Sequence, residues 1–168
     1  MPYNLDKLKS IHCFDAVTIR VPERWQCGPD FELEEFWSCY EDDGDTGTLW
    51  IAVQWFRGPE VLEGIPNAVT RQLAEDATQS INEKNPNILT SEIEDIPGGH
   101  LVFRMYEANE DEDPTRHYRY QVYRFHEDKM AFADFNLVIT RSLIDEPEFR
   151  DLIRIMDREI RGAQFEPF

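Results

Sequence analysis

The chain has 168 residues, and its 34 acidic and 17 basic side chains give a formal net charge of −17 at pH 7. This acidic excess argues against binding to nucleic acids or anionic membranes, because both depend on clustered lysine and arginine. Hydrophobic residues make up 41% of the chain, with eleven Phe, six Tyr and four Trp, so residues 1–168 should form a single globular domain.

The N-terminal segment and the cysteines both indicate the cellular compartment in which the protein is located. Residues 1–10 contain no apolar signal core, and no run of the sequence is long enough to be a transmembrane span. The three cysteines form neither an even set nor a CxxC pair, so a disulfide framework is not expected. These features predict a cytoplasmic protein.

The first third of the chain is predicted to be β-structure. Residues 14–21 are rich in β-favouring side chains, and Pro22 ends this first strand because proline has no amide proton to donate. Two more strands are predicted at residues 31–40 and 48–57, joined by a polar hairpin loop at residues 41–47. Both faces of residues 48–57 are apolar, which favours a central strand covered on both sides.

Two segments have the periodicity of amphipathic helices. In residues 67–85 apolar side chains recur every fourth residue, with Asn67 as the expected N-cap and Asn85 before Pro86 as the stop. A second helix is predicted from Pro147 to Gly162. The apolar side of the first helix comprises Val69, Leu73, Ala74, Ala77 and Ile81, and that of the second comprises Phe149, Leu152, Ile153, Met156 and Ile160.

Between the helices the period returns to two. Residues 91–96 are predicted to form a short strand, and residues 101–141 carry three strand-like runs that should form an antiparallel meander. Residues 107–113 are expected to be an acidic loop between two of these strands. The predicted fold class is therefore α+β: one antiparallel sheet of about six to seven strands, flanked by two main helices.

Motifs for common chemistry are missing from the sequence. There is no Walker loop, GxGxxG, GxSxG or HExxH pattern, and no His or Cys pair has zinc-ligand spacing. The Asp-rich segment at residues 42–45 does not follow the order of an EF-hand loop. We therefore predict no enzyme activity, no metal site and no cofactor.

Aromatic residues supply the candidate contact surface. Trp50 and Phe56 lie opposite the core-facing side of their strand, and we expect the sheet's second layer to cover Trp50. The candidate surface for a protein partner lies on the predicted meander and comprises Tyr106, Tyr118, Tyr120 and Tyr123.

Residues 14–25 carry the sequence FDAVTIRVPERW, in which Pro22 and Trp25 form a Pro-x-x-Trp ending. With the order of hairpin, helix, strand meander and closing helix, this segment resembles the Mog/PsbP-like family. The resemblance implies an α/β/α sandwich and a non-enzymatic module. Members include a Ran-binding nuclear transport factor, photosystem extrinsic subunits, small lipoproteins and bacterial chaperones of type VI secretion effectors. The resemblance assigns no functional residue, because Pro22 and Trp25 match a folding motif.

Three functions stay open from the sequence. The first is a cytoplasmic adaptor or chaperone-like module that binds another protein, such as a secreted effector or other basic partner, or that forms a homodimer. The second is a small-ligand-binding or enzymatic domain in which His117, Arg119 or Cys39 converge on a deep pocket. The third, an acidic inhibitor or immunity protein for a basic toxin, rests on charge alone.

Overall fold

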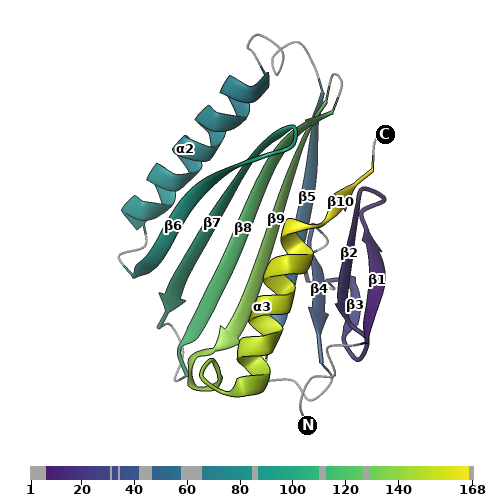
Figure 1. The fold of residues 1–168 in the computed structure, drawn as a ribbon, viewed down its shortest axis with the longest axis vertical. Coiled ribbons are helices and arrows are strands. Elements are labelled where there is room, and N and C mark those ends of the chain that lie inside the picture. Colours follow the sequence, from purple (N-terminus) through teal and green to yellow (C-terminus); the bar gives the residue numbers. More distant parts are fainter. Residues whose placement is uncertain are drawn as a thin grey trace.

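The computed structural model describes residues 7–30, 32–33, 35–41, 47–57, 66–84, 87–109, 113–126 and 129–166, and all structural statements concern these residues. Two antiparallel sheets and two main helices make up the fold (Figure 1). The strands are β1 (Leu8–Cys13), β2 (Val17–Pro22), β3 (Gln26–Pro29), β4 (Trp37–Tyr40), β5 (Thr48–Arg57), β6 (Ile88–Ile96), β7 (Gly99–Ala108), β8 (Thr115–His126), β9 (Lys129–Thr140) and β10 (Gln164–Phe165). The helices are α2 (Pro66–Lys84) and α3 (Pro147–Arg161), with a short 3-10 turn η1 (Arg141–Leu143) before α3.

The large sheet has the strand order β3-β4-β5-β9-β8-β7-β6, and the small sheet has the order β1-β2-β10. Strands β7, β8 and β9 pair consecutively and antiparallel, so the predicted meander is confirmed. The predicted α+β class, with an antiparallel sheet flanked by two helices, is also confirmed. The small second sheet was not predicted.

The first strand was predicted wrongly as one run over residues 14–21. In the structure a strand, β1, ends before this segment at Cys13, and β2 begins only at Val17; the two strands pair as a hairpin with Cys13 opposite Val17. The turn between them holds Phe14 and Asp15 at positive φ, 55° and 51°. Left-handed backbone at a Phe is rare, so alternation of side-chain type could not indicate this turn.

The strand predicted at residues 31–40 is also shorter than expected. Within the described residues only Trp37–Tyr40 is extended, as β4. Its partner β3 covers Gln26–Pro29, where no strand was predicted. Residues 42–46, which include the predicted Asp-rich loop, lie outside the described part of the chain.

Both predicted helices are present, with small differences at their ends. Helix α2 begins at Pro66, so Asn67 lies inside the helix and is not its N-cap. Helix α3 begins at Pro147 and is followed by Gly162 as predicted. Its buried face includes Ile155, which the prediction omitted, whereas Ile153 is only half-buried. No helix in the described residues combines the length and apolar composition needed to cross a bilayer.

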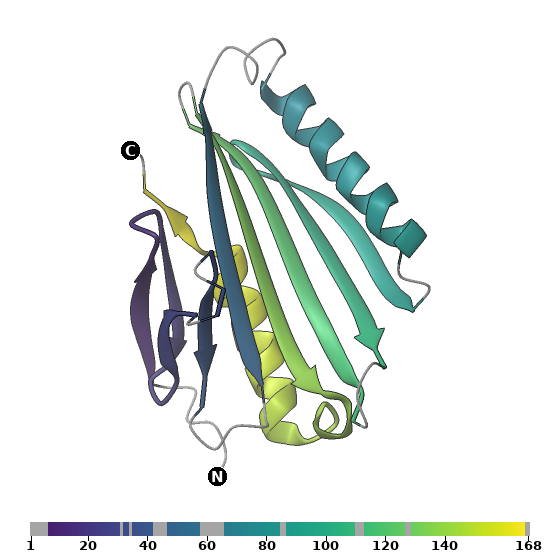
Figure 2. The ribbon, with the colours of Figure 1, turned by 180° about the vertical axis from the view of Figure 1, so that it is seen from behind.

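The two helices lie on opposite faces of the large sheet, as the two views show (Figures 1 and 2). The main core fills the space between one sheet face, helix α3 and the small sheet. Its fully buried side chains include Trp25, Tyr120, Phe135, Leu152 and Met156. Each buried side chain of this size contributes about 1.5–3 kcal/mol of transfer free energy, so this core dominates stability.

Helix α2 covers only part of the other face. It contacts β6, β7 and β8, and its apolar cluster is small: Ala74 packs with Val102 and Tyr123. On β5 the core-facing Leu49 and Ile51 are fully buried, whereas Trp50 is half-buried and Phe56 is 39% exposed on the α2 side. The prediction that β5 is covered on both faces is therefore wrong, because α2 stops short of it.

Candidate functional site

The side chains of β5 and β9 beside α2, which are partly exposed except for buried Met130, form a surface that we call the open strip. Register places Trp50 beside Asn136, Ala52 beside Asp134, Gln54 beside Phe132 and Phe56 beside Met130. Side chains alternate between the faces of a strand, so these residues all lie on the α2 side of the sheet. The open strip comprises Trp50, Ala52, Gln54, Phe56, Met130, Phe132, Asp134 and Asn136.

One end of the open strip is hollowed next to the segment that joins β3 to β4. This hollow has a volume of about 220 Å³. Phe36 packs edge-on against Trp50 with ring centroids 6.4 Å apart, and Leu33 is 48% exposed at the rim. Arg119, Asp134 and Asn136 supply its polar side. Aromatic walls around a few polar groups are typical of a site that accepts one side chain.

The other end of the open strip is hollowed against α2. Here the volume is about 440 Å³, and Val69 and Leu73 of α2 face Phe56 and Phe132 of the sheet. Tyr123 packs on Phe132 with ring centroids 5.1 Å apart and closes the base. This second hollow is mostly apolar, whereas the first one has polar groups along one side.

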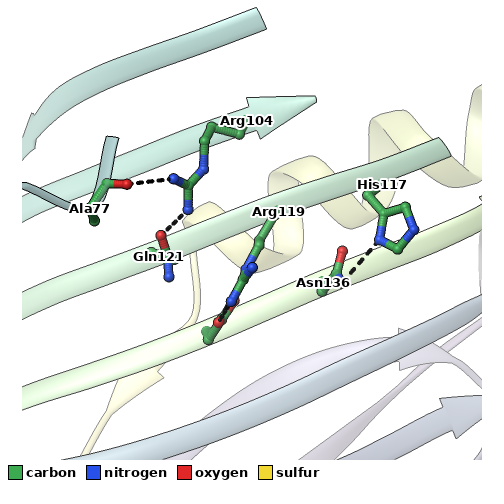
Figure 3. A network of polar contacts seen from close by, with 7 residues as sticks. Ala77, Arg104, His117, Arg119, Gln121 and Asn136 are labelled. Atoms are coloured by element: carbon green, nitrogen blue, oxygen red, sulfur yellow. Dashed lines mark hydrogen bonds and ion pairs between the residues drawn. The ribbon is translucent and has the colours of Figure 1, made fainter. Parts of the chain in front are cut away.

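Beneath α2, the sheet carries an unusual pair of cations. Arg104 and Arg119 lie directly opposite one another on β7 and β8. Arg104 is fully buried and donates to the carbonyl oxygen of Ala77 in α2 at 3.0 Å and to the side chain of Gln121 (Figure 3). Burial lowers the pKa of Arg104, and the positive charge of Arg119 lowers it further. Arg104 thereby fixes α2 to the sheet.

Arg119 balances its charge with a carboxylate on the next strand. Its Nε lies 3.0 Å and 3.1 Å from the two carboxylate oxygens of Asp134, and Nη2 donates to the same group. The hydrogen bonds to Asp134 raise the pKa of Arg119 above its ordinary value. Arg119 is therefore held as a charged, oriented group at the wall of the first hollow.

His117 forms a separate set of polar contacts near the start of β8. Nδ1 of His117 lies 3.2 Å from Nδ2 of Asn136 (Figure 3), and Nε2 lies 3.1 Å from Oγ1 of Thr115. Tyr106 stacks on the imidazole with ring centroids 4.7 Å apart. Both ring nitrogens thus have partners, so the arrangement orients Asn136 and offers no free general base. The Oδ1 atom of Asn136 is buried and has no hydrogen-bond partner in the described chain.

The four tyrosines predicted as one contact surface do not form an exposed patch. Tyr118 and Tyr120 point into the main core, with exposures of 7% and 1%, and the hydroxyl of Tyr120 donates to Asp157 at 2.7 Å. Tyr123 lies on the opposite face but is covered by α2. Only Tyr106 is partly exposed, so a role in contacting a partner stays a prediction for it alone.

The residues predicted to converge on a deep pocket are separated. His117 and Arg119 share the α2 face of β8, but Cys39 pairs with Leu49 on β5 and is buried on the core face. The hollow beside Arg119 has a volume of about 220 Å³. Among the described residues, no group of three or more His, Cys, Asp or Glu side chains is placed to hold a metal ion.

Two features of this region were not found from the sequence. The predicted acidic loop at residues 107–113 begins too early: Glu107 lies in β7 and accepts hydrogen bonds from Arg116 and Arg141, which lower its pKa. Leu33 and Phe36 were assigned to a strand, although they form the wall of the first hollow. The alternation within residues 48–57 did place Trp50 and Phe56 on one face, but it could not show where α2 ends.

Comparisons with known proteins identify the fold. No family model matches the sequence, and no curated protein matches it. Three solved structures are similar: LpqN of Mycobacterium tuberculosis, which is involved in cell envelope biogenesis, cyanobacterial PsbP (CyanoP) of Synechocystis sp. PCC 6803, and the Ran-binding protein Mog1p of Saccharomyces cerevisiae.

Their TM-scores are 0.62, 0.58 and 0.52 at sequence identities of 10%, 9% and 10%. The matches cover 96%, 95% and 94% of this chain and 91%, 92% and 95% of the respective neighbours. The chain therefore has the Mog/PsbP-like fold, as its sequence predicted.

Proposed function

We propose that this chain, with its Mog/PsbP-like fold, is a non-enzymatic module that binds another protein through the open strip. The observation that carries this proposal is the incomplete cover of the large sheet. Half-buried Trp50 and 39%-exposed Phe56 mark the two ends of one continuous surface, and Leu33 at its rim is 48% exposed. Exposed aromatic residues that cluster over a rigid sheet are typical of protein-contact surfaces.

The polar groups of the open strip support binding over catalysis. Arg119 is already bound by Asp134, and both nitrogens of His117 have partners. The hollow beside Trp50, at about 220 Å³, is smaller than the roughly 300–1,000 Å³ of most small-molecule sites. It suits a single side chain of a partner, and a donor on that side chain would satisfy the buried Oδ1 of Asn136.

The net charge supports a basic partner. At −17, the chain should attract a basic protein over distances of about a Debye length, roughly 8 Å at physiological salt. Such steering acts mainly on the association rate, which should therefore fall as salt is added. An adaptor or chaperone for a basic effector fits this, as does an inhibitor of a basic toxin. Cytoplasmic location and self-association stay predictions.

Among the structural neighbours, Mog1p is a Ran-binding protein, so this fold serves protein recognition in that case. Sequence identity of 10% carries only the fold, and no contact residue is transferred.

The test is affinity capture from a lysate of the source organism, compared quantitatively among three baits. The baits are the unchanged chain, Phe56→Ser in the open strip and Leu89→Ser on β6. Leu89 is 51% exposed and lies on the far edge strand, so its replacement removes a similar exposed apolar group elsewhere.

The proposal expects a protein that is retained by the unchanged chain and by Leu89→Ser, and is depleted by Phe56→Ser. Capture that is equal for all three baits, or no capture at all, contradicts it. Size-exclusion chromatography of the same three proteins determines whether the captured partner is a second copy of this chain.

A further inference from the structure

The three cysteines of the chain come together in space, although they lie on three different strands. Cys13 ends β1, Cys27 lies in β3 and Cys39 lies in β4. All three are free thiols. Cys27 and Cys39 occupy directly opposed positions of the antiparallel pair, and their side chains share a hydrogen bond. The sequence predicted no such pair, since spacing along the chain does not show strand register.

The backbone at this pair has the geometry that a cross-strand disulfide needs. The amide of Asp30 donates to the carbonyl of Phe36 at 2.8 Å, so Asp30 and Phe36 form a hydrogen-bonded position of the ladder. Hydrogen-bonded and non-hydrogen-bonded residue pairs alternate along an antiparallel ladder. Cys27 and Cys39 form the third residue pair before Asp30 and Phe36, so theirs is a non-hydrogen-bonded pair. At such positions the Cα atoms are about 4.5 Å apart, within the range of native disulfides.

The two thiols differ in access. Cys27 is half-buried on β3, the edge strand of the large sheet, and borders a surface hollow of about 680 Å³. Cys39 is fully buried behind it. The hydrogen bond from Cys39 lowers the pKa of Cys27, and the nearby charge of Lys9 lowers it as well, whereas the same hydrogen bond raises the pKa of Cys39. Cys27 is therefore the thiol that ionises first and that a reagent reaches first.

Cys13 is excluded from this chemistry by its surroundings. It is fully buried, and burial raises its pKa to about 12. It lies at the end of β1, which pairs with β2 in the other sheet, so no strand register aligns it with Cys27 or Cys39.

We propose that Cys27 and Cys39 form a redox-active pair that a low-molecular-weight disulfide, such as glutathione disulfide, converts into a cross-strand disulfide. The Cys27 thiolate attacks one sulfur of the reagent; its S–S bond breaks, one glutathione leaves as a thiolate and takes up a proton, and a mixed disulfide forms on Cys27. The Cys39 thiol then attacks the Cys27 sulfur while its proton passes to the second glutathione, which leaves as a thiol. The protein dithiol is oxidised by two electrons, and the reagent is reduced to two thiols.

This disulfide would close the base of the segment that joins β3 to β4. That segment carries Leu33 and Phe36, and it folds back through hydrogen bonds from the amides of Glu32 and Leu33 to the Asp30 side chain, both at 2.9 Å. Oxidation would thus fix the wall of the first hollow of the open strip. The inference itself concerns the thiols and does not depend on the proposed function.

The test treats the reduced, folded protein with glutathione disulfide and maps its thiols by alkylation, proteolysis and mass spectrometry without reductant. We expect oxidation to make the unchanged chain lighter by the mass of two hydrogen atoms. After alkylation and proteolysis, a Cys27–Cys39 linked peptide should be present and Cys13 should be alkylated. Dithiothreitol should restore three alkylatable thiols.

Three variants separate the roles. Cys13→Ser should still form the Cys27–Cys39 disulfide. Cys39→Ser should stop at the mixed disulfide between Cys27 and glutathione. Cys27→Ser should form neither the mixed disulfide nor the protein disulfide. Far-UV circular dichroism checks that each variant is folded when treated. Three thiols that stay free in the unchanged chain, a stable glutathione adduct on its Cys27, or a disulfide that includes Cys13 would each overturn the proposal.

Discussion

Arg119 and Asp134 lie on neighbouring strands β8 and β9, and the guanidinium Nε bridges both oxygens of the carboxylate at 3.0 Å and 3.1 Å. Arg104 faces Arg119 directly across β7 and β8 and is fully buried. The charge of Asp134 reaches both arginines: it raises the pKa of Arg119, and at Arg104 it offsets part of the lowering that burial and the charge of Arg119 cause. The negative charge of Asp134 therefore compensates the positive charges of buried Arg104 and half-buried Arg119, so that both can lie under α2 in the folded sheet.

Replacement of Asp134 by Ala should therefore destabilise the fold well beyond the loss of one surface ion pair. Breaking a fully buried pair costs about 3–5 kcal/mol, and partial exposure of the Arg119 side chain, 29%, reduces the expected cost to about 2 kcal/mol. Urea unfolding followed by circular dichroism measures this difference in the free energy of unfolding.

The matched control is Asp151→Ala in α3. Asp151 pairs with Arg154 at 3.2 Å, but the two side chains are 52% and 75% exposed, so its removal should change stability by less than about 0.5 kcal/mol. Equal effects at Asp134 and Asp151 would show that Asp134 is not needed to compensate Arg104 and Arg119.

Arg104 should control the attachment of α2. In Arg104→Met the methylene packing is largely kept, but the hydrogen bonds to Ala77 and Gln121 are lost. The α2 amides near Ala77 should then exchange their hydrogens about tenfold faster, which corresponds to about 1.4 kcal/mol of local stability. Hydrogen exchange followed by mass spectrometry measures this, with α3 as the internal reference.

Arg71→Met serves as the control for this experiment, because Arg71 lies on the exposed side of α2 and pairs with Glu75 in the next turn. It should leave the exchange of α2 nearly unchanged. If Arg104→Met left α2 as protected as in the unchanged chain, the apolar contacts of Ala74 and Tyr123 would be sufficient to hold the helix.

Glu159 should make stability depend on pH in the acid range. Burial opposes its ionisation, but hydrogen bonds from Arg20 at 2.8 Å and 2.9 Å and from Arg158 outweigh burial, and its pKa is lowered. Because the folded-state pKa lies below that of the unfolded chain, the stabilisation is complete above the ordinary pKa and is lost as pH falls through the lowered one.

Glu159→Gln should therefore be less stable than the unchanged chain at pH 7, by about 1 kcal/mol, and should lose less stability between about pH 5 and pH 2. Thermal midpoints measured across this range provide the comparison. Parallel curves for the two proteins would show that Glu159 does not contribute to the acid sensitivity.

The sequence predicted best those features that depend on local periodicity. Alternation over residues 101–141 correctly predicted the meander of β7, β8 and β9, and Pro147 and Gly162 correctly bounded α3. Periodicity failed where a fold depends on contacts between distant residues. Tyr118 and Tyr120 were assigned to the right strand, but only the position of α3 shows that they are buried.

The candidate site depends on such distant contacts throughout. Trp50 and Phe56 share a face by alternation, yet their exposure follows from where α2 crosses the sheet. Cys27 and Cys39 are brought together by the β3–β4 register, which no spacing rule in the sequence shows. Strand register and helix placement, which decide both sites, are set by the whole core.

The most direct test of the open strip is titration of the captured and purified partner, with affinity measured by isothermal calorimetry. We predict that Phe56→Ser and Leu33→Ser each weaken binding at least tenfold, as loss of about 1.4 kcal/mol from an aromatic or apolar anchor would. Leu89→Ser should bind within about twofold of the unchanged chain, since Leu89 is exposed on the opposite edge strand. Unchanged affinity for both open-strip variants, or an equal loss for Leu89→Ser, would contradict the proposed binding surface.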